Sequence, residues 1–417
     1  MKIADVVKEQ ARKAKEASKV LAATETAQKN EALLLMARKL RENISEVAQA
    51  NQDDCKEAQE KGISANLLNR LKFDRAKIES RAAALEGIAA LPDPVGDTDY
   101  CTRRPSGLEV KKMRVPIGVV GVIFEARPHV VPNVGALCLK AGNAAIMRGG
   151  SEALRSISIM GELWEKTLEE SGIPTAAVYV ISTSEREAVN TLITLDEYLD
   201  LLIPRGGIEL IKLVKENGTV PIIKHFNGIC HVYLDQSAPE GIATRVTHNS
   251  KLLMPEVCNA AETLLIHEKA ARRLLPPVAE ALVKDGVTLK GCPKAKEILG
   301  WMEDATEEDW STEYLDLILS VKVVSSLEEA VDHINNYGSH HTDVIVTDDY
   351  NGAKKFSRGV DSGVVLVNAS TMFNDGEQLG MGAEVGLSTD KLHARGPVGL
   401  RDLTSYKYVV EGSGQIM

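Results

Sequence analysis

The sequence predicts an α/β protein built on parallel sheets, and three observations lead to this prediction. Short apolar segments rich in β-branched residues alternate with segments of helical periodicity along most of the chain, which is the pattern of repeated βαβ units. The length of 417 residues corresponds to two to three domains at roughly 150 residues each. A content of 44% hydrophobic and 26% charged residues is typical of a globular protein with a large core.

Residues 1–90 are predicted to form a run of helices. Good helix formers (Ala, Glu, Lys, Gln and Leu) dominate residues 3–60 and 64–90. The breaker segment 91–97, Leu-Pro-Asp-Pro-Val-Gly-Asp, is expected to end this run.

Strands and helices are predicted to alternate from residue 108 onwards. The first set has strands at 108–115, 116–124, 144–148, 178–181 and 198–203, and helices at 129–140, 151–171, 185–194 and 207–217. A second set begins near residue 230, with strands at 230–234, 263–266, 319–324, 343–347 and 363–367, and helices at 240–252 and 268–285. Residues 108–115 and 405–410 alternate between apolar and polar, which favours a separate small sheet that reaches another subunit.

Charge and composition disfavour several classes of function. The net charge of −10 opposes binding to a nucleic-acid backbone as the main function, and an aromatic content of 4% opposes a base-stacking surface. No apolar run approaches the ~20 residues of a membrane-spanning helix, and the N-terminus lacks the apolar core of a signal peptide. Six cysteines are too few for a disulfide framework. We therefore expect a cytoplasmic protein with free cysteines.

Two Arg-Gly-Gly turns indicate a nucleotide site. Each follows a predicted strand and precedes a predicted helix: Arg148-Gly149-Gly150 before Ser151, and Arg205-Gly206-Gly207 after Pro204. Backbone N–H groups at a helix N-terminus favour phosphate, and the carboxyl ends of parallel strands form the ligand crevice of open α/β sheets. The alternative is that both are tight turns with exposed arginines. The usual dinucleotide fingerprint G-x-G-x-x-G is absent.

Cys258 is the strongest candidate for a nucleophile. It lies in a polar loop directly before an apolar strand, next to Asn259, whose amide and neighbouring N–H groups are suited to hold an oxyanion. The other cysteines fit ordinary roles, in apolar segments for Cys138 and Cys230, and in polar surroundings without a recognisable partner for Cys55, Cys101 and Cys292.

Three histidines, His333, His340 and His341, lie close together in the sequence. A metal site is one interpretation. However, adjacent side chains on an extended segment point to opposite faces, and no further ligand motif accompanies them. We therefore favour substrate ligands or solvated residues and expect no metal.

Seven motifs in order resemble the aldehyde dehydrogenase superfamily and, within it, the family of γ-glutamyl phosphate reductases. They are GVIFEARP (121–128), KAGNAAIMRGG (140–150), IPRGG (203–207), CNAAETLL (258–265), AVDHINNYGSHHTD (330–343), VNAST (367–371) and KLHARGP (391–397). The match covers essentially the whole chain.

The resemblance implies two Rossmann-like α/β domains and a small β oligomerisation flap. Residues 1–229 would form the cofactor-binding domain, with 100–115 contributing to the flap. Residues 230–365 would form the catalytic domain, and 366–417 would return to the cofactor domain and complete the flap. A homo-oligomer, dimer or tetramer, is expected, with a glutamate 5-kinase as a further partner.

The resemblance also implies the cofactor. Arg148 stands where the superfamily usually has a lysine near the adenosine ribose, and Ser151 stands where NAD-preferring members often have a glutamate. A neutral residue leaves room for a 2′-phosphate that Arg148 can pair with, so NADPH is expected over NADH. Glu313 is expected at the nicotinamide ribose, or else is a solvated acid before a strand.

The implied reaction is the reduction of L-glutamate 5-phosphate to L-glutamate 5-semialdehyde through a thioacyl intermediate on Cys258, a step of proline biosynthesis. Members that oxidise aldehydes carry a glutamate that activates the hydrolytic water, and the corresponding segment here begins with His225-Phe226. These two residues also depart from the small residues common in the reductases, and the sequence assigns them no role.

The expected substrate ligands each have an ordinary alternative. Arg127 would neutralise the departing phosphate, or form a surface ion pair. The remaining candidates, for the amino and carboxylate groups of the substrate, are Asn368, Ser370, Thr371, His341 and Arg395. Ser370 and Thr371 would otherwise satisfy a turn, and His341 and Arg395 would otherwise be structural. Two other functions remain open, an aldehyde-oxidising NAD(P)-dependent dehydrogenase and a non-catalytic scaffold.

Overall fold

The computed structural model describes residues 2–417, except for the side chain of Asn66, and Met1 of the predicted first domain lies outside the described residues. Contacts divide the chain into two compact units. The first unit comprises Met1–Lys224, Gly380–Gly386 and Val398–Met417, and the second comprises His225–Leu379 and Leu387–Pro397. The second unit thus extends beyond the predicted catalytic domain at both of its ends.

The helical run predicted at the start of the chain is confirmed for the described residues. It consists of α1 (Ile3–Leu21), α2 (Thr26–Glu42), α3 (Ile44–Glu60), α4 (Ala65–Leu71) and α5 (Arg75–Ala90). Asp74 begins α5 as its N-cap, accepting a hydrogen bond from the N–H of Lys77 at 2.9 Å. The breaker segment after α5 is anchored by Asp93, which pairs with the buried Lys29 at 2.5 Å.

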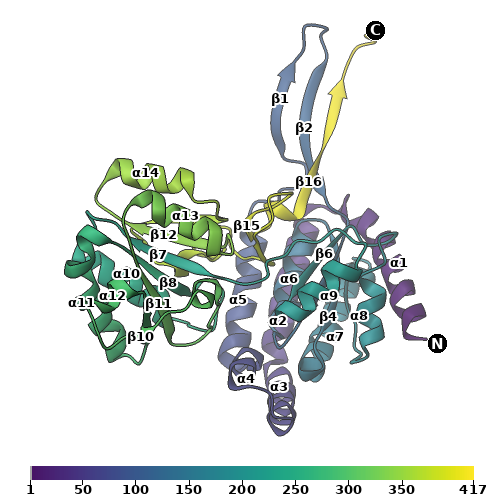
Figure 1. Ribbon diagram of the computed structural model, residues 1–417. Coiled ribbons are helices and arrows are strands. Elements are labelled where there is room, and N and C mark those ends of the chain that lie inside the picture. Colours follow the sequence, from purple (N-terminus) through teal and green to yellow (C-terminus); the bar gives the residue numbers. More distant parts are fainter. Residues whose placement is uncertain (1) are drawn as a thin grey trace. The chain divides into compact units, whose positions relative to one another are not determined.

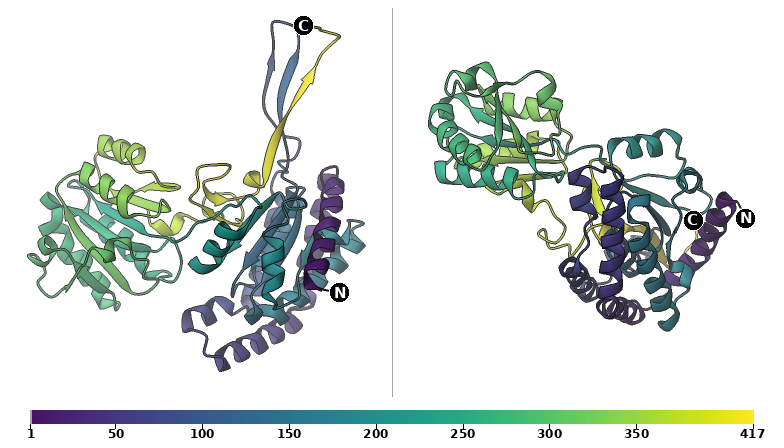
Figure 2. Two further views of the ribbon diagram at one scale, coloured as in Figure 1. Left: turned by 45° about the vertical axis from the view of Figure 1, so that its right-hand side comes forward. Right: turned by 90° about the horizontal axis from the view of Figure 1, so that it is seen from below.

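The first unit contains a four-stranded parallel sheet in the order β5-β4-β3-β6. Its elements are β3 (Val119–Phe124), α6 (Val130–Lys140), β4 (Ala144–Gly149), α7 (Leu154–Glu170), β5 (Val178–Val180), α8 (Arg186–Leu192), β6 (Leu201–Arg205) and α9 (Ile208–Asn217). Every residue of β3 and β4 is buried, as in a sheet covered on both faces, and Figure 2 shows the helices of this unit around it.

Two strand starts were predicted wrongly. The predicted strand 116–124 begins at Val119, because Pro116 ends the preceding strand. The predicted strand 198–203 begins at Leu201. Residues 198 and 199 close a turn instead, because their N–H groups both bond to the carbonyl of Leu195, at 2.9 and 2.8 Å.

A separate antiparallel sheet, here called the flap, stands away from the helices of the first unit (Figure 1). Its strands, in the order β1-β2-β16, are β1 (Thr98–Arg103), β2 (Glu109–Pro116) and β16 (Thr404–Glu411). The pairing of the two alternating segments is confirmed, with Ser405 opposite Val115. The strand β1 was not predicted, because its Thr-Asp-Tyr-Cys-Thr-Arg sequence is mostly exposed and carries no apolar alternation.

The second unit contains a seven-stranded sheet whose described pairings are all parallel. In spatial order its strands are β10 (Glu303–Asp304), β9 (Thr288–Gly291), β11 (Ile318–Val324), β8 (Ala261–His267), β7 (Cys230–Leu234), β12 (Thr342–Val346) and β13 (Val364–Val367). Its helices are α10 (Glu240–Leu252), α11 (Glu268–Lys284), α12 (Pro293–Lys296), α13 (Leu327–Tyr337) and α14 (Tyr350–Gly359).

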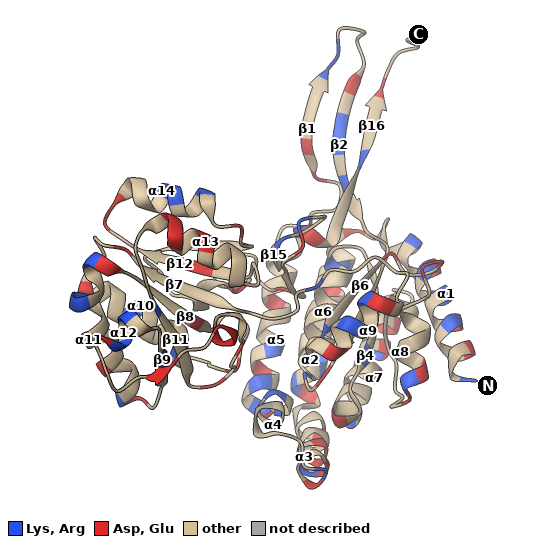
Figure 3. Cartoon of the chain, viewed as in Figure 1, with Lys and Arg blue, Asp and Glu red and all other residues tan. Residues whose placement is uncertain are grey.

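Charged residues of both signs are interspersed along the helices of each unit (Figure 3). The strands β14 (Gly386–Ser388) and β15 (Gly396–Val398) pair in a further two-stranded sheet. Among residues 2–417, no helix combines the length and the apolarity needed to cross a membrane.

Candidate active site

The amino ends of three neighbouring strands bring together one cysteine and two histidines. His225 precedes β7, Cys258 precedes β8 and His341 precedes β12, and β7 lies between β8 and β12 in the parallel sheet. The sulfur of Cys258 and one ring nitrogen from each histidine all lie within 4.8 Å of one another. The parallel topology therefore assembles this group from segments far apart in the sequence.

The electrostatics of this group favour the thiolate. Burial of the thiol opposes ionisation, but His341 and His225 outweigh burial and hold the pKa of Cys258 well below its usual range. Conversely, burial would lower the pKa of His341, but the neighbouring Cys258 and Glu313 raise it above its usual value. The site thus stabilises a negatively charged sulfur beside an imidazolium.

The ring of His225 has a defined orientation. Its Nδ1 lies 3.1 Å from the carbonyl oxygen of Leu387, and a carbonyl oxygen only accepts hydrogen bonds. The neutral ring therefore carries its proton on Nδ1 and its lone pair on Nε2. The His225 and His341 rings meet edge to face, with centroids 5.6 Å apart.

The backbone around Cys258 is tightly held. The thiol of Cys230 donates to the carbonyl oxygen of Cys258 at 3.2 Å. Gly228 lies so close that a Cβ built on it would be 1.7 Å from the same oxygen. Beside it, the N–H of Ile229 donates to Ser339 Oγ at 2.8 Å. Position 228 therefore has no room for a Cβ atom, and only glycine fits there.

Asn259 and Glu313 lie in the same region of the second unit. The amide nitrogen of Asn259 donates to the carbonyl of Asn374 at 3.1 Å, which orients the side chain. Glu313, before β11, accepts the N–H of Gly228 at 2.7 Å. Burial, and after it the thiolate of Cys258, raise the pKa of Glu313, against the opposing hydrogen bond from Gly228. The predicted contact of Glu313 with a nicotinamide ribose stays a prediction.

A buried ion pair lies directly behind the cysteine loop. Lys251, near the end of α10, pairs with Glu262 of β8 at 2.7 Å, and both side chains are 0% exposed. The other carboxylate oxygen of Glu262 accepts the N–H of Leu315 at 3.2 Å. Burial raises the pKa of Glu262 to about 7 against the opposing effect of Lys251. The pair fixes the helix, the strand and the loop before β11 to one another.

The residues predicted to bind the substrate differ in how far their side chains are already hydrogen-bonded within the protein. The amide of Asn368 is held by both backbone groups of Thr347, at 2.9 Å each. The hydroxyl of Ser370 accepts the N–H of Met372 at 3.2 Å, the turn role weighed above, whereas the hydroxyl of Thr371 is buried without a hydrogen-bond partner.

Arg395 is held by Asp361. Its guanidinium donates to the side chain and to the carbonyl of Asp361, at 2.7 and 2.8 Å. This geometry supports the structural alternative for Arg395.

The three histidines of the 330–343 motif lie in different surroundings. His333 Nδ1 lies 3.0 Å from the ammonium of Lys322, His340 Nδ1 lies 2.6 Å from the carbonyl of Asp361, and His341 lies beside Cys258. The predicted spread of adjacent residues to opposite sides agrees with this placement. His341 contacts the nucleophile candidate, whereas the sequence suggested a substrate ligand.

The predicted cofactor residues lie at one edge of the sheet in the first unit. Because β4 and β6 flank β3 in a parallel sheet, the two Arg-Gly-Gly turns lie at the same carboxyl edge, on either side of the end of β3. Arg148 is 9% exposed and donates to the carbonyl of Ser184 at 3.0 Å. Its Nε and that of Arg205 are buried without a hydrogen-bond partner. Two unsatisfied guanidinium donors fit an anionic ligand such as a dinucleotide phosphate.

Two glutamates already accept hydrogen bonds from backbone N–H groups at this edge. Glu125 accepts the N–H of Gly207 at 2.8 Å, and a Cβ on Gly206 would lie 2.4 Å from the same oxygen. Glu152 accepts the N–H of Ala126 at 2.5 Å. Gly149 ends β4 and Ser151 begins a short 3₁₀ helix.

Arg127 follows β3 at the same edge. The pKa of His129 is lowered to about 3, first by burial and then by the nearby Arg127 and Arg205. These two arginines therefore contribute positive charge where the first unit would meet an anion.

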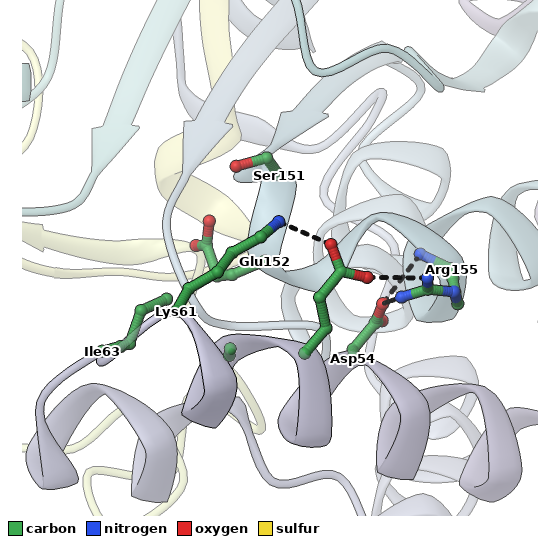
Figure 4. A pocket seen from close by; sticks show the side chains of 8 residues that line it. Asp54, Lys61, Ile63, Ser151, Glu152 and Arg155 are labelled. Carbon is green, nitrogen blue, oxygen red and sulfur yellow. Dashed lines mark hydrogen bonds and ion pairs between the residues drawn. The ribbon is translucent and has the colours of Figure 1, made fainter.

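A pocket in the first unit opens beside Ser151, between α3 and the start of α7 (Figure 4). The residues that line it are Asp54, Glu57, Ala58, Lys61, Ile63, Ser151, Glu152 and Arg155. Lys61 and Arg155 both pair with Glu57, at 2.5 and 2.7 Å. Because the cations are already paired and Glu152 adds a further acid, the pocket lacks the positive charge that a phosphate group requires.

Sequence reasoning missed the position of His225 beside Cys258. The cysteine loop is recognisable because it directly precedes an apolar strand. His225 is recognisable only when the loops before neighbouring strands of the same sheet are compared. That position, just before β7, was the available signal.

The comparisons with known proteins agree with the motifs. The aldehyde dehydrogenase family model matches residues 2–291. The γ-glutamyl phosphate reductase of Moorella thermoacetica is 49% identical over 416 residues, covering 100% of both chains, and that of Carboxydothermus hydrogenoformans is 50% identical over 412 residues, covering 99% of both. The crystal structure of the γ-glutamyl phosphate reductase from Thermotoga maritima matches with a TM-score of 0.95 and 44% identity, covering 99% of both chains.

These findings confirm the predicted resemblance and the predicted α/β fold. The chain belongs to the aldehyde dehydrogenase family and, within it, to the group of γ-glutamyl phosphate reductases.

Proposed function

We propose that the chain reduces L-glutamate 5-phosphate to L-glutamate 5-semialdehyde and phosphate with NADPH, as a cytoplasmic step of proline biosynthesis. The observation that carries the proposal is the cluster of Cys258, His225 and His341, in which His225 begins the segment where aldehyde-oxidising members place a hydrolytic glutamate. The reductases that match the chain over its full length support the substrate.

Cys258 acts as the nucleophile. Its thiolate attacks the acyl carbon of the substrate, a C–S bond forms, and the C–O bond to phosphate breaks with release of inorganic phosphate. The product of this step is a thioester. His225 and His341 hold the sulfur in its charged form before the attack, and His225 is oriented for this by its hydrogen bond to Leu387.

Asn259 stabilises the oxyanion that develops on the acyl oxygen, together with nearby backbone N–H groups. When bound, NADPH would supply a hydride to the acyl carbon of the thioester, and the aldehyde forms as the thiolate leaves. Expulsion of the thiolate then returns Cys258 to its starting state. Arg127 is proposed to neutralise the departing phosphate, and Thr371, with its unsatisfied hydroxyl, to bind the amino acid end of the substrate.

The cofactor is proposed to bind at the carboxyl edge of the sheet in the first unit. The residues assigned to it are Arg148, Gly149, Gly150, Ser151, Pro204, Arg205, Gly206 and Gly207, with Glu313 at the nicotinamide ribose. The unsatisfied Nε atoms of Arg148 and Arg205 support this assignment.

The reverse reaction separates this proposal from aldehyde oxidation. Glutamate 5-semialdehyde and NADP⁺ are incubated with and without phosphate, and NADPH is followed by absorbance. We expect NADPH formation to require phosphate, with no free glutamate produced. Phosphate-independent NADPH formation with release of glutamate would instead establish an aldehyde-oxidising dehydrogenase, and no NADPH under either condition would favour a scaffold.

Replacement of the nucleophile tests the thioacyl step. Cys258→Ala should abolish turnover without changing the thermal unfolding temperature by more than a few degrees. Cys101→Ala is the matched control, because Cys101 is an exposed cysteine of the flap, and it should retain turnover. Substantial activity in Cys258→Ala would contradict the mechanism.

Replacement of Arg148 tests the choice of NADPH. A charge-assisted hydrogen bond to a phosphate contributes about 1.5–3 kcal/mol, so Arg148→Ala should raise KM for NADPH by roughly 10- to 150-fold with little effect on NADH. Arg155→Ala, whose guanidinium pairs with Asp54 and Glu57, is the control. Equal losses with both cofactors would assign Arg148 a structural role.

The flap is proposed to assemble a dimer or tetramer, since its strands are largely exposed. Light scattering on the full chain and on a chain with Tyr406 and Tyr408 replaced by serine tests this assembly. A glutamate 5-kinase is the proposed partner because it makes the unstable acyl phosphate, and co-elution of the two proteins tests that contact.

A further inference from the structure

The three donors at the amino ends of β7, β8 and β12 have the composition of a zinc site. One thiolate and two imidazoles are borderline-soft ligands of the kind that bind Zn²⁺, and a site with three protein ligands leaves a fourth position open. Cys258 and His225 are only partly buried, so an ion can reach them, whereas His341 is buried.

The distances are close to those of a bound ion. Zn–S and Zn–N bonds of about 2.3 and 2.0–2.1 Å place tetrahedral ligand atoms roughly 3.3–3.6 Å apart. The donors of Cys258, His225 and His341 already lie within 4.8 Å of one another. Small rotations of the partly buried Cys258 and His225 side chains toward the buried His341 would close the site.

The outer contacts of both histidines are those of ligating imidazoles. A histidine that binds a metal usually donates its other ring N–H to an oxygen, which fixes the ring and the tautomer. His225 does so from Nδ1 to the carbonyl of Leu387 at 3.1 Å. His341 has Nδ1 2.7 Å from the hydroxyl of Thr342, and its Nε2 is buried without a hydrogen-bond partner. In the neutral form of each ring, these contacts leave Nε2 as the nitrogen available to a metal.

We propose that Cys258, His225 and His341 form a reversible binding site for Zn²⁺ that blocks the nucleophile. The ion takes the cysteine sulfur as a thiolate ligand, and the proton that His341 holds beside the thiolate is released to solvent so that the neutral imidazole can bind. While the ion is bound, the sulfur lone pair is committed to the metal and does not attack a substrate. The inhibitory consequence rests on the proposed reductase function, but the binding itself does not.

Cobalt substitution tests the binding directly. Co²⁺ is titrated into the full-length, metal-free protein, and the thiolate-to-cobalt charge-transfer band is followed by absorbance. We expect saturation at one Co²⁺ per chain and displacement of the bands by Zn²⁺. The charge-transfer band should vanish in Cys258→Ser, and His225→Asn should weaken binding by at least about tenfold.

A surface histidine supplies the matched control. His248 is an exposed residue of the second unit that pairs with Asp285 at 2.7 Å, so His248→Asn should leave the cobalt spectrum unchanged. Circular dichroism verifies that each variant is folded. An unchanged charge-transfer band in Cys258→Ser, or unchanged affinity in folded His225→Asn, would overturn the site.

Inhibition is measured separately from binding. If the metal-free protein catalyses the reductase reaction, Zn²⁺ should inhibit the reaction with an inhibition constant equal to its Kd from the cobalt displacement titration. A chelator should then restore the activity. If the metal-free protein has no reductase activity, the proposed function fails while the cobalt spectrum still decides the metal site. Full activity at saturating Zn²⁺ would refute the blocking role.

Discussion

Gly228→Ala should disable the nucleophile without touching it. A Cβ at this position would lie 1.7 Å from the carbonyl oxygen of Cys258 and 2.7 Å from its Cα. Ordinary contact begins at 3.4 Å, so the two backbones must separate by about 1.7 Å to reach van der Waals contact. The clashing atoms belong to the backbone of Cys258, so a change of side-chain rotamer cannot relieve the clash.

The segment that contains Gly228 has little freedom to absorb this displacement. The N–H of Gly228 is bound to Glu313 at 2.7 Å, and the next N–H is bound to Ser339 at 2.8 Å. The cysteine loop is therefore the segment expected to move. Since a misplacement of about 1 Å can cost roughly 100-fold in rate, we expect kcat/KM to fall by at least about that factor.

The assay is turnover in the phosphate-dependent reverse direction, together with the rate of Cys258 alkylation and the thermal unfolding temperature. Gly241→Ala is the control in the same unit, because its Cβ would meet only Arg245 Nη1 at 3.4 Å and alanine in a helix gains about 0.5–1 kcal/mol over glycine. Wild-type turnover in a folded Gly228→Ala protein would refute the reasoning.

Two further predictions concern stability. Glu262→Ala leaves Lys251 charged and unpaired in the interior, so the free energy of unfolding measured in urea should fall by about 3–5 kcal/mol, and a double replacement with Lys251→Met should recover most of it; an unchanged midpoint in the single variant would contradict this. The pKa of Asp361 is lowered to about 2 by Lys391 and Arg395, below the unfolded value of 3.8. Its contribution is therefore present above about pH 4 and lost as the pH falls through 2, and the unfolding temperature should drop more in the wild type than in Asp361→Asn over that window, whereas parallel curves would show that the pair contributes nothing.

Most strands of the two parallel sheets were predictable because they are short, largely buried apolar segments between helices. The elements that were missed lack such a signal. The strand β9, second from the edge of its sheet, is partly exposed, β10 has two residues, and α14 combines two glycines with mostly polar residues. The helix α13 was also missed, because its segment was interpreted only through its histidines.

The nucleophile was predictable from local sequence, but its neighbours were not. Cys258 stands out because a polar loop meets an apolar strand at that point. The pairing of Cys258 with His225 and His341 depends on strand order, in which β7 lies between two strands that are distant from each other in the sequence. Likewise, only the structure shows that the amide of Asn368 is engaged by the backbone of Thr347.

The flap has a consequence for the timing of synthesis. Its middle strand, β2, ends at Pro116, whereas its partner β16 begins at Thr404, and two segments of the first unit follow the whole of the second unit's main segment. At roughly 5–20 residues per second on the ribosome, the chain between the two strands takes on the order of 15 to 60 seconds to emerge. During that interval β2 exposes an unpaired edge on the nascent chain. The order of translation therefore leaves this hairpin with an open edge until the last residues of the chain have been made.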